Sequence, residues 1–154
     1  MKDMLDASVV ADLVARALAM TARAYAPYSR FQVGAAVLAA SGRVYTGANV
    51  ENASFGATVC AERNAIAAAV CHGERRLVAL AVAGGRDGRV TDFCTPCGIC
   101  RQVMREFCDP RTFQIFVART PMDYTGFTLD ALLPESFGPE TPGLRGGMDS
   151  ERKE

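Results

Sequence analysis

A short, continuous apolar run near the middle of the chain limits the folds open to it. Residues 77–84 read LVALAVAG and lie between charged and glycine-rich flanks. A strand that is apolar at every position, rather than at alternate ones, is buried on both of its faces. The sequence therefore predicts a central strand in a sheet that is covered from both sides.

Patterns on either side of this run supply the other elements. Apolar residues recur at spacings of three and four in the alanine-rich N-terminal stretch, which is typical of an amphipathic helix. Two β-leaning runs split at Ser41-Gly42 indicate a hairpin. The expected elements are a helix from about Asp6 to Ala24, strands at 31–40 and 43–50, a helix from an N-cap at Thr58 to about Cys71, a strand at 77–84, a helix from Pro96 to about Phe107, a strand at 112–118, and a short helix at 127–134. They predict an α/β fold, a three-layer α/β/α sandwich around a mixed central sheet. We expect about five strands in this sheet, of which the four above are located.

The length of 154 residues suits one compact domain with its own core. No internal repeat and no long linker divides the chain. Beyond the last expected helix, glycines and charged residues dominate. We therefore expect a single domain over residues 1–138 and a loosely ordered tail over 139–154.

The charge balance argues against polyanionic partners. The chain has 17 basic and 17 acidic residues, so it offers no electrostatic footprint for nucleic acid or an anionic membrane. No apolar run reaches the roughly 18 residues of a membrane span, and aspartates interrupt the start of the chain, unlike a secretory signal. We expect a cytoplasmic protein that binds neither nucleic acid nor membrane.

Six cysteines in a reducing compartment are metal ligands, catalytic groups or small buried residues more often than disulfide partners. Cys97 and Cys100 are three apart at the expected start of a helix, where both thiols can chelate one ion. Cys60 has a similar place in the earlier helix, so the two helix starts could converge on one zinc ion. Three protein ligands leave an open position, which is typical of catalytic zinc, and Glu62 is then the natural proton carrier. Residues two apart, such as Cys60 and Glu62, do not share a helix face.

A CxxC pair alone leaves other interpretations open. It can be a structural zinc site, a redox pair or neither, although the strand and helix context of a thioredoxin-like site is missing here. Cys94, three residues before Cys97, could complete a closed site with four sulfur ligands. Cys71 and Cys108 fall near helix ends and are expected to be packed as small apolar residues.

With these motifs in place, TVCAERNA and PCGICRQV resemble the zinc-dependent cytidine deaminases, specifically the small homotetrameric kind with three cysteine ligands. The resemblance extends to AYAPYSRFQVGAAVL, GANVENASFG and LLPESFGPE, and thus from Ala24 to Glu140. It implies one Zn²⁺ per subunit. The implied reaction is hydrolytic deamination of cytidine and 2'-deoxycytidine to uridine and 2'-deoxyuridine, with release of ammonia, in pyrimidine salvage.

The resemblance also assigns the metal site. Cys60, Cys97 and Cys100 match the zinc ligands, and Glu62 matches the general acid/base that passes a proton from water to N3 and to the departing amine. Three thiolates give a bound zinc ion a net negative environment. Arg63 is placed to offset that charge by hydrogen bonding to ligand sulfurs.

The remaining matches concern the nucleoside. The resemblance implies ribose contacts from Asn49 and Glu51, an aromatic wall beside the pyrimidine from Phe31, a backbone contact to the ring carbonyl at Ala61, and a ring lent to a neighbouring subunit's pocket by Phe137. Phe55 departs from the pattern, because many relatives carry a tyrosine there. A homotetramer with shared active sites is implied.

Two rival functions stay open at this point. One is deamination of another aminated nucleoside, such as an aminonucleoside antibiotic, or of a base within nucleic acid, although the neutral net charge argues against nucleic acid. The other is a non-catalytic, zinc-stabilised module in which Cys94 is the fourth ligand.

Overall fold

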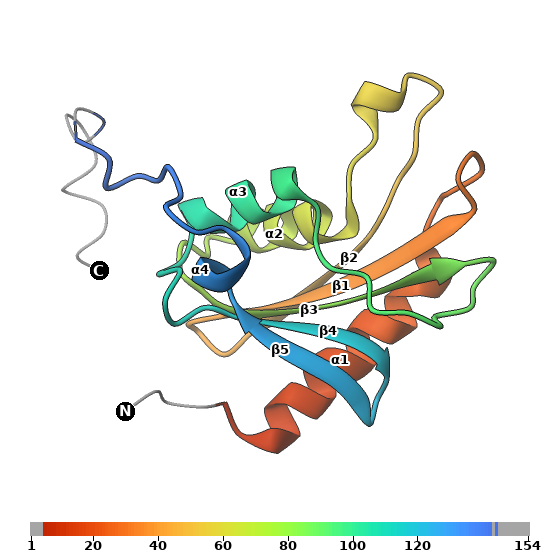
Figure 1. Ribbon diagram of the computed structural model, residues 1–154, viewed down its shortest axis with the longest axis horizontal. Coiled ribbons are helices and arrows are strands. Elements are labelled where there is room, and N and C mark those ends of the chain that lie inside the picture. Colours follow the sequence, from red (N-terminus) through yellow and green to blue (C-terminus); the bar gives the residue numbers. More distant parts are fainter. Residues whose placement is uncertain (1–4, 143, 145–154) are drawn as a thin grey trace.

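The computed structural model describes residues 5–142 and residue 144, and its framework is a five-stranded mixed sheet (Figure 1). The strands are β1 (Phe31–Ala39), β2 (Val44–Ala48), β3 (Leu77–Arg86), β4 (Gln114–Thr120) and β5 (Asp123–Thr128), in the spatial order β2-β1-β3-β4-β5. β3 and β4 are parallel, and every other neighbouring pair is antiparallel. The expected central strand is thus confirmed as β3.

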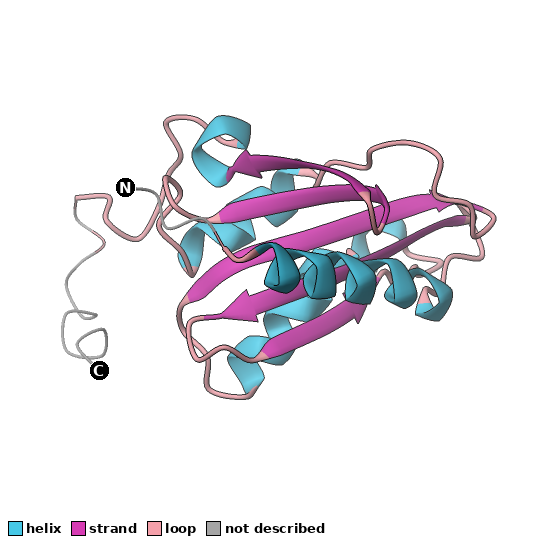
Figure 2. Cartoon of the chain, turned by 90° about the horizontal axis from the view of Figure 1, so that it is seen from below, coloured by secondary structure: helices cyan, strands magenta, loops and turns pink. Residues whose placement is uncertain are grey.

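Helices cover both faces of this sheet. α1 (Ala7–Met20) lies across one face and continues as a 3₁₀ turn over Thr21–Arg23. α2 (Ala61–Cys71), α3 (Gly98–Glu106) and the short α4 (Leu129–Leu132) lie on the other face (Figures 1 and 2). The three-layer α/β/α sandwich expected from the sequence is therefore confirmed.

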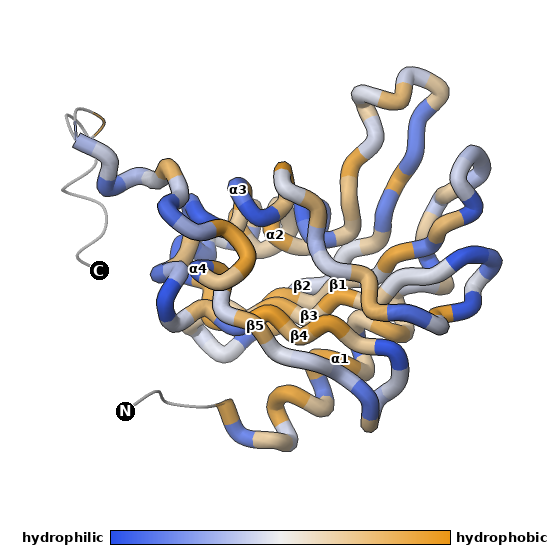
Figure 3. Tube along the Cα trace, in the orientation of Figure 1, coloured by the Kyte–Doolittle hydropathy of each residue, from blue (hydrophilic) through white to orange (hydrophobic). Residues whose placement is uncertain are grey.

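The core is divided between the two faces of the sheet. On the α1 side, Leu13, Val14 and Ala17 pack against alternate residues of β1, β3 and β4. On the opposite side, Ile66 of α2 and Met104 of α3 belong to one buried cluster with the other alternate residues of the same strands. Figure 3 shows the hydrophobic positions gathered along the sheet. The continuous apolar run of β3 is explained by this double coverage.

Gly47 of β2 sets how closely α2 approaches the sheet. A Cβ atom at this position would lie 2.5 Å from the carbonyl oxygen of Ala61 and 2.4 Å from the backbone nitrogen of Ala65. Both distances are far inside van der Waals contact, so only glycine allows the first turn of α2 to rest directly on the strand.

Residues 49–60 form an arm between β2 and α2 that stands away from the sheet (Figure 1). At its base, Val50 and Val59 exchange two backbone hydrogen bonds, each 3.0 Å long. A 3₁₀ turn, Phe55–Ala57, lies near the tip, and the ring of Phe55 is 74% exposed. The base of the arm is thus fixed, whereas an aromatic side chain is presented to solvent at its tip.

Three expected element boundaries were wrong. The N-cap of α2 is Cys60, not Thr58, and α3 begins at Gly98 with Cys97 as its N-cap, after Pro96. The expected helix at 127–134 is only α4, because residues 123–128 pair with β4 as the edge strand β5. The side chain of Thr128 accepts a hydrogen bond from the Ala131 backbone and so marks the change from strand to helix.

The described part of the expected tail is residues 139–142 and 144, and the rest of 139–154 lies outside the described residues. The domain boundary at residue 138 stays a prediction. Among the described residues, the longest helix falls short of the length and apolar character that crossing a membrane requires.

Candidate metal centre

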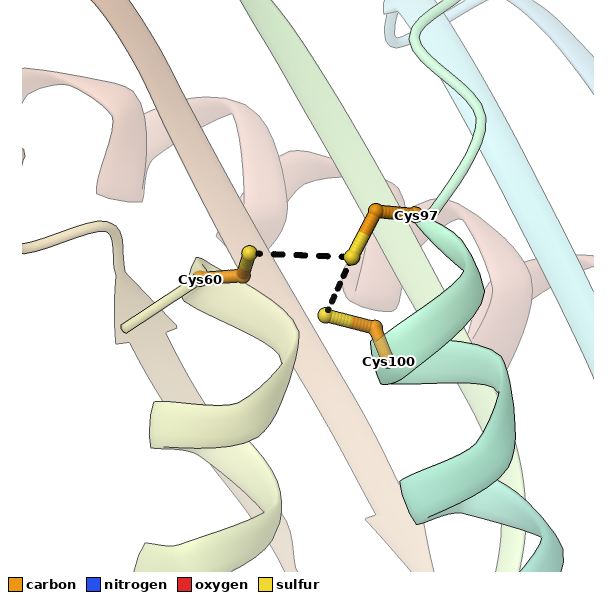
Figure 4. Close-up of side chains that lie close together, drawn as sticks. All are labelled: Cys60, Cys97 and Cys100. Carbon is orange, nitrogen blue, oxygen red and sulfur yellow. Dashed lines mark hydrogen bonds between the residues drawn. The ribbon is translucent and has the colours of Figure 1, made fainter. Parts of the chain in front are cut away.

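Three sulfur atoms meet where α2 and α3 begin side by side (Figure 4). The Sγ atom of Cys97 lies 3.8 Å from that of Cys60 and 3.5 Å from that of Cys100. All three sulfurs lie within 4.8 Å of one another. Zinc–sulfur bonds of about 2.3 Å in a tetrahedral arrangement separate the sulfurs by roughly 3.8 Å. The spacing of the three cysteines therefore fits one zinc ion with a position left for a non-protein ligand.

The conformation of the two helix N-caps explains the convergence. Cys60 and Cys97 are both in the extended region, with φ and ψ of −68° and 155° and of −66° and 163°. Neither side chain makes a capping hydrogen bond to its own helix. Cys100 lies one turn into α3 and is buried. The cap thiols are thus available to a metal instead of to the helix backbone.

The environment favours a thiolate at Cys60. Its interaction with the Cys100 thiol, and then with Arg63, lowers the pKa of Cys60 to about 5. The same interaction with Cys60, together with burial, raises the pKa of Cys100. The contacts of Cys60 thus favour its thiolate, which is the form that binds metal.

Glu62 lies against the same sulfurs, although it follows Cys60 by only two residues. Its side chain is buried, with 4% of the residue exposed, and burial raises the pKa of its carboxyl group to about 7. The thiolate of Cys60 contributes to this shift in the same direction. Two residues that are two apart within a helix do not share a face. This does not separate Cys60 from Glu62, because Cys60 is an N-cap in the extended conformation and only Glu62 is inside the helix.

Arg63 contacts the ligand set directly. Its Nη2 atom donates to the Cys60 Sγ at 3.6 Å and to the Thr58 carbonyl oxygen at 3.2 Å. The nearby sulfurs, with Cys60 first, raise the pKa of the guanidinium. Its Nε is buried with no hydrogen-bond partner in the described part of the chain. The guanidinium of Arg63 is therefore held in contact with the sulfur cluster.

Cys94 is not part of this cluster. Within the described residues, the only metal-ligand group that contains sulfur is Cys60, Cys97 and Cys100. Cys94 is not among the three cysteines whose sulfurs lie within 4.8 Å of one another. The closed four-sulfur alternative thus has no geometric support among these residues.

Phe31 and Ala61 lie on different elements, β1 and α2. Phe31 is the first residue of β1, is 38% exposed, and lines a pocket of about 150 Å³ with Phe93 and Cys94. Ala61 is buried at the first position of α2, where backbone N–H groups have no partner inside the helix. Phe31 thus borders a pocket that contains Cys94, and Ala61 places the N-terminus of α2 directly after Cys60.

Asn49 and Glu51 are both engaged with the N-terminal end of β1. The buried Asn49 side chain accepts from the Val33 backbone at 2.8 Å and donates to the Phe31 carbonyl oxygen at 2.9 Å. Glu51 accepts from the backbone nitrogens of Tyr28 and Ser29, at 2.9 and 3.2 Å, and from the Ser29 hydroxyl.

The Ser29 hydroxyl bond, more than any other contact, lowers the pKa of Glu51. The support of Glu51 by Tyr28 and Ser29 was not predicted, since those residues are more than 20 positions away and no local pattern links them. Contacts within the chain therefore hold both of the predicted sugar-binding side chains in place.

Phe137 lies in the segment that follows α4 and is 62% exposed. Its carbonyl oxygen accepts a hydrogen bond from the Gln102 side chain of α3 at 2.9 Å. Its backbone is thus attached to the helix that supplies Cys97 and Cys100, while its ring is largely open to solvent.

Comparison with known proteins is consistent with this geometry. Residues 8–116 match the family model described as the cytidine and deoxycytidylate deaminase zinc-binding region. A cytidine deaminase of Halalkalibacterium halodurans is 44% identical over 128 residues, which are 83% of this chain and 93% of that protein. One from Sporosarcina psychrophila is 41% identical over 131 residues, 85% of this chain and 93% of that protein.

Solved structures give the same result. The crystal structure of cytidine deaminase from Burkholderia pseudomallei has a TM-score of 0.74 and 41% identity, and the match covers 82% of this chain and 97% of that one. The structure of cytidine deaminase from Mycobacterium tuberculosis has a TM-score of 0.69 and 44% identity, covering 82% and 95%. The similarity thus spans nearly the full length of these solved chains.

Proposed function

Because the chain belongs to the cytidine and deoxycytidylate deaminase family, we propose that it hydrolyses the C4 amine of cytidine and 2'-deoxycytidine. The products are uridine or 2'-deoxyuridine and ammonia. The observation that carries the proposal is the meeting of three cysteine sulfurs with one buried carboxyl group at two adjacent helix starts. A structural zinc site needs no acid beside it, whereas hydrolysis does.

The protein's own contribution to the chemistry is centred on Glu62. Cys60, Cys97 and Cys100 would hold a Zn²⁺ ion, which would supply Lewis acidity for the attacking water. Glu62 would accept the proton of that water and deliver protons to N3 and to the departing amine. A pKa of about 7 suits both steps, because the group then gains and loses a proton readily near neutral pH.

Arg63 would tune the metal. Three thiolates around a divalent cation leave a net charge of about −1, which weakens its Lewis acidity. The guanidinium contact with the Cys60 sulfur withdraws part of that negative charge.

The nucleoside would be held by groups that surround the metal centre. We assign Phe31 to the face of the pyrimidine and the backbone of Ala61 to its carbonyl group. Asn49 and Glu51 would bind the ribose hydroxyls with the hydrogen-bonding capacity that their present contacts leave over. Polar groups that lose a sugar partner are costly to bury, so a free base would be a poor substrate.

We also propose a homotetramer in which Phe137 enters the pocket of a neighbouring subunit, and a place in cytoplasmic pyrimidine salvage. The exposure of Phe137 and Phe55, at 62% and 74%, supports a role for these rings in contacts between subunits. The test mixes Glu62→Gln subunits, which keep Phe137, with Phe137→Ala subunits, which keep Glu62. Because loss of the ring is expected to raise KM, a KM for cytidine that falls towards the parent value after reassembly supports a shared site, while a KM that stays at the value of Phe137→Ala alone contradicts it.

The function itself is tested with zinc-loaded protein and free nucleosides. We expect ammonia release and stoichiometric uridine from cytidine, and none from cytosine or from a cytosine-containing oligonucleotide. Absence of ammonia from cytidine and deoxycytidine, with one zinc bound per subunit and the fold intact, would overturn the proposal. A survey of other aminated nucleosides would follow.

A further inference from the structure

Arg105 of α3 is a buried cation that faces the segment around Phe137. Its Nε atom donates to the Ser136 hydroxyl at 2.9 Å. Its Nη2 and Nη1 atoms donate to the two carboxylate oxygens of Glu140 at 2.6 and 3.4 Å. One guanidinium therefore binds the chain on both sides of Phe137, with a two-pronged contact to Glu140 that fixes direction as well as distance.

Further contacts complete this clamp, which we define as Arg105, Gln102, Ser136, Gly138 and Glu140. Gln102 holds the carbonyl oxygen of Phe137 at 2.9 Å. Gly138 passes so close to the guanidinium that a Cβ atom there would lie 2.5 Å from Cζ of Arg105. The backbone on each side of Phe137 is thus tied to α3.

The ring that this clamp surrounds gains little from its own subunit. Phe137 is 62% exposed, although the guanidinium that holds its neighbours is almost fully buried. Burying a charge is costly unless it is paired and hydrogen-bonded. Such an arrangement around an exposed aromatic side chain is expected where the side chain must be held ready for a partner, because a fixed side chain loses less conformational entropy on binding.

We propose that Arg105 is a positioning residue, which holds the segment from Ser136 to Glu140 so that Phe137 is presented to the nucleoside pocket of a second copy of the chain. The inference rests on the proposed role of Phe137 in a shared site. The same helix begins with Cys97 and Cys100, so the clamp also ties the presented ring to the helix that supplies two metal ligands.

The first test is Glu140→Ala, which removes the clamp's carboxylate and leaves α3 unchanged. A ring that packs on the nucleoside equally in the ground state and the transition state affects KM and leaves kcat unchanged. We expect KM for cytidine to rise about 5- to 10-fold, with kcat within about 2-fold and one zinc per subunit retained. Glu140→Gln, which keeps the shape and a hydrogen-bonding oxygen, should recover part of the loss.

Two further variants test whether a rise in KM comes from loss of the clamp. Gly138→Ala pushes the guanidinium from the opposite side and should raise KM in the same way. The matched control is Glu135→Ala, which removes one negative charge next to the same segment and, among the described residues, makes no hydrogen bond or ion pair with Arg105. It should leave KM unchanged, and an equal rise in this control would contradict the clamp.

A double-mutant comparison decides whether the clamp acts through Phe137. If it does, Glu140→Ala raises KM in the parent protein and has no further effect in a Phe137→Ala background. A full, multiplicative effect in that background, or no effect of Glu140→Ala in the parent protein, would overturn the inference.

The failures of the two proposals give different results. If Phe137→Ala leaves KM unchanged in a protein that still deaminates cytidine, the positioning role is wrong and the deaminase function stands. If the parent protein does not deaminate cytidine at all, the proposed function fails first.

Discussion

The starts of α2 and α3 have almost the same backbone and different side chains. Each helix has a cysteine at its N-cap in the extended conformation, Cys60 for α2 and Cys97 for α3. Two residues later, α2 has the buried Glu62, where α3 has Ile99, which is 63% exposed. Three residues later, α2 has Arg63 and α3 has Cys100.

This difference follows from where the helices lie. The first turn of α2 rests on the sheet beside Gly47, so that its second residue is buried and the pKa of the carboxyl group there is raised. Residue 99 of α3 instead faces solvent. In the proposed site, the start of α2 would therefore supply a ligand, the acid and the compensating cation, and the start of α3 would supply two ligands, although both helices have the same kind of N-cap.

The largest effect should come from the features that the two starts share. Cys60→Ser and Cys97→Ser each remove one of the sulfur ligands, so both proteins should lose stoichiometric zinc and all measurable turnover. Zinc content by atomic emission and ammonia release measure this. Cys94→Ser is the matched control and should keep both, and loss of zinc in that variant would restore the four-sulfur alternative.

The second residue of each helix should separate the two starts. Glu62→Gln keeps the shape of the side chain and removes its proton transfer, so kcat should fall by about 10²–10⁴-fold while zinc stays bound. Ile99→Ala, at the equivalent position of α3, should change kcat by less than about 2-fold. Substantial turnover by Glu62→Gln with full zinc occupancy would contradict the assigned role.

The third residue tests the charge balance at the sulfur cluster. Arg63→Gln removes the cation that contacts Cys60, and changes of this kind next to metal ligands typically cost about 10–100-fold in metal affinity or activity. A competition titration with a chelator measures the affinity. Arg63→Lys retains the charge and should lie between the parent protein and Arg63→Gln. Unchanged zinc affinity and activity in Arg63→Gln would show that the contact is incidental.

The packing of α2 against β2 should be sensitive to a single added methyl group. Gly47→Ala introduces a Cβ atom against the backbone of Ala61 and Ala65, and it should lower the free energy of unfolding by about 1–3 kcal/mol. Denaturant unfolding at matched zinc content measures this. Gly56→Ala, with no atom within 4 Å of the new Cβ, is the control. Equal stability of the two variants would argue against direct packing of α2 on β2.

The smallest expected effect concerns the cysteines at the C-terminal ends of α2 and α3. Cys71, at the end of α2, is exposed, whereas Cys108, just beyond α3, packs against the core and its pKa is raised by burial to about 12. The raised pKa leaves a thiolate fraction on the order of 10⁻⁴ at pH 8, which grows about tenfold with each unit of rising pH.

We therefore expect a thiol reagent to label Cys71 rapidly at pH 8, and Cys108 slowly and increasingly at higher pH. Peptide mapping by mass spectrometry distinguishes the two positions, with Cys71→Ser as the control for assignment. Rapid labelling of Cys108 at pH 8 would contradict its burial.

The sequence was sufficient for the layers of the fold and for the pair Cys97 and Cys100, because both depend on short-range patterns, whereas family resemblance joined Cys60, 37 positions earlier, to that pair. The apolar run of β3 and the cysteine spacing at 97 and 100 are local features. β5 was missed because residues 123–128 form an edge strand with a mixed burial pattern, and the start of α2 was misplaced because threonine is the commoner N-cap. The prediction that Cys71 is packed as a small apolar residue was also wrong, since Cys71 is exposed at the end of α2.

The contacts around the candidate sugar-binding groups and Phe137 could not be predicted in the same way. The contact between Arg105 and Glu140 joins residues 35 positions apart, and the contact between Ser29 and Glu51 joins residues 22 positions apart. No propensity or spacing rule relates such pairs, because the fold as a whole brings them together. Family resemblance suggested roles for Glu51 and Phe137, and only coordinates reveal what holds them.

In the arm between β2 and α2, the length of the loop is independent of the distance between the groups at its two ends. Asn49 and Glu51 lie at one end and Cys60 at the other, while the bridge between Val50 and Val59 joins the two ends irrespective of what lies between them. Residues 53–57 can therefore vary in length and sequence without altering the separation of the two ends, whereas Thr58 is fixed by its contact with Arg63. For a protein engineer, this tip is a natural place for an inserted peptide or an altered assembly contact.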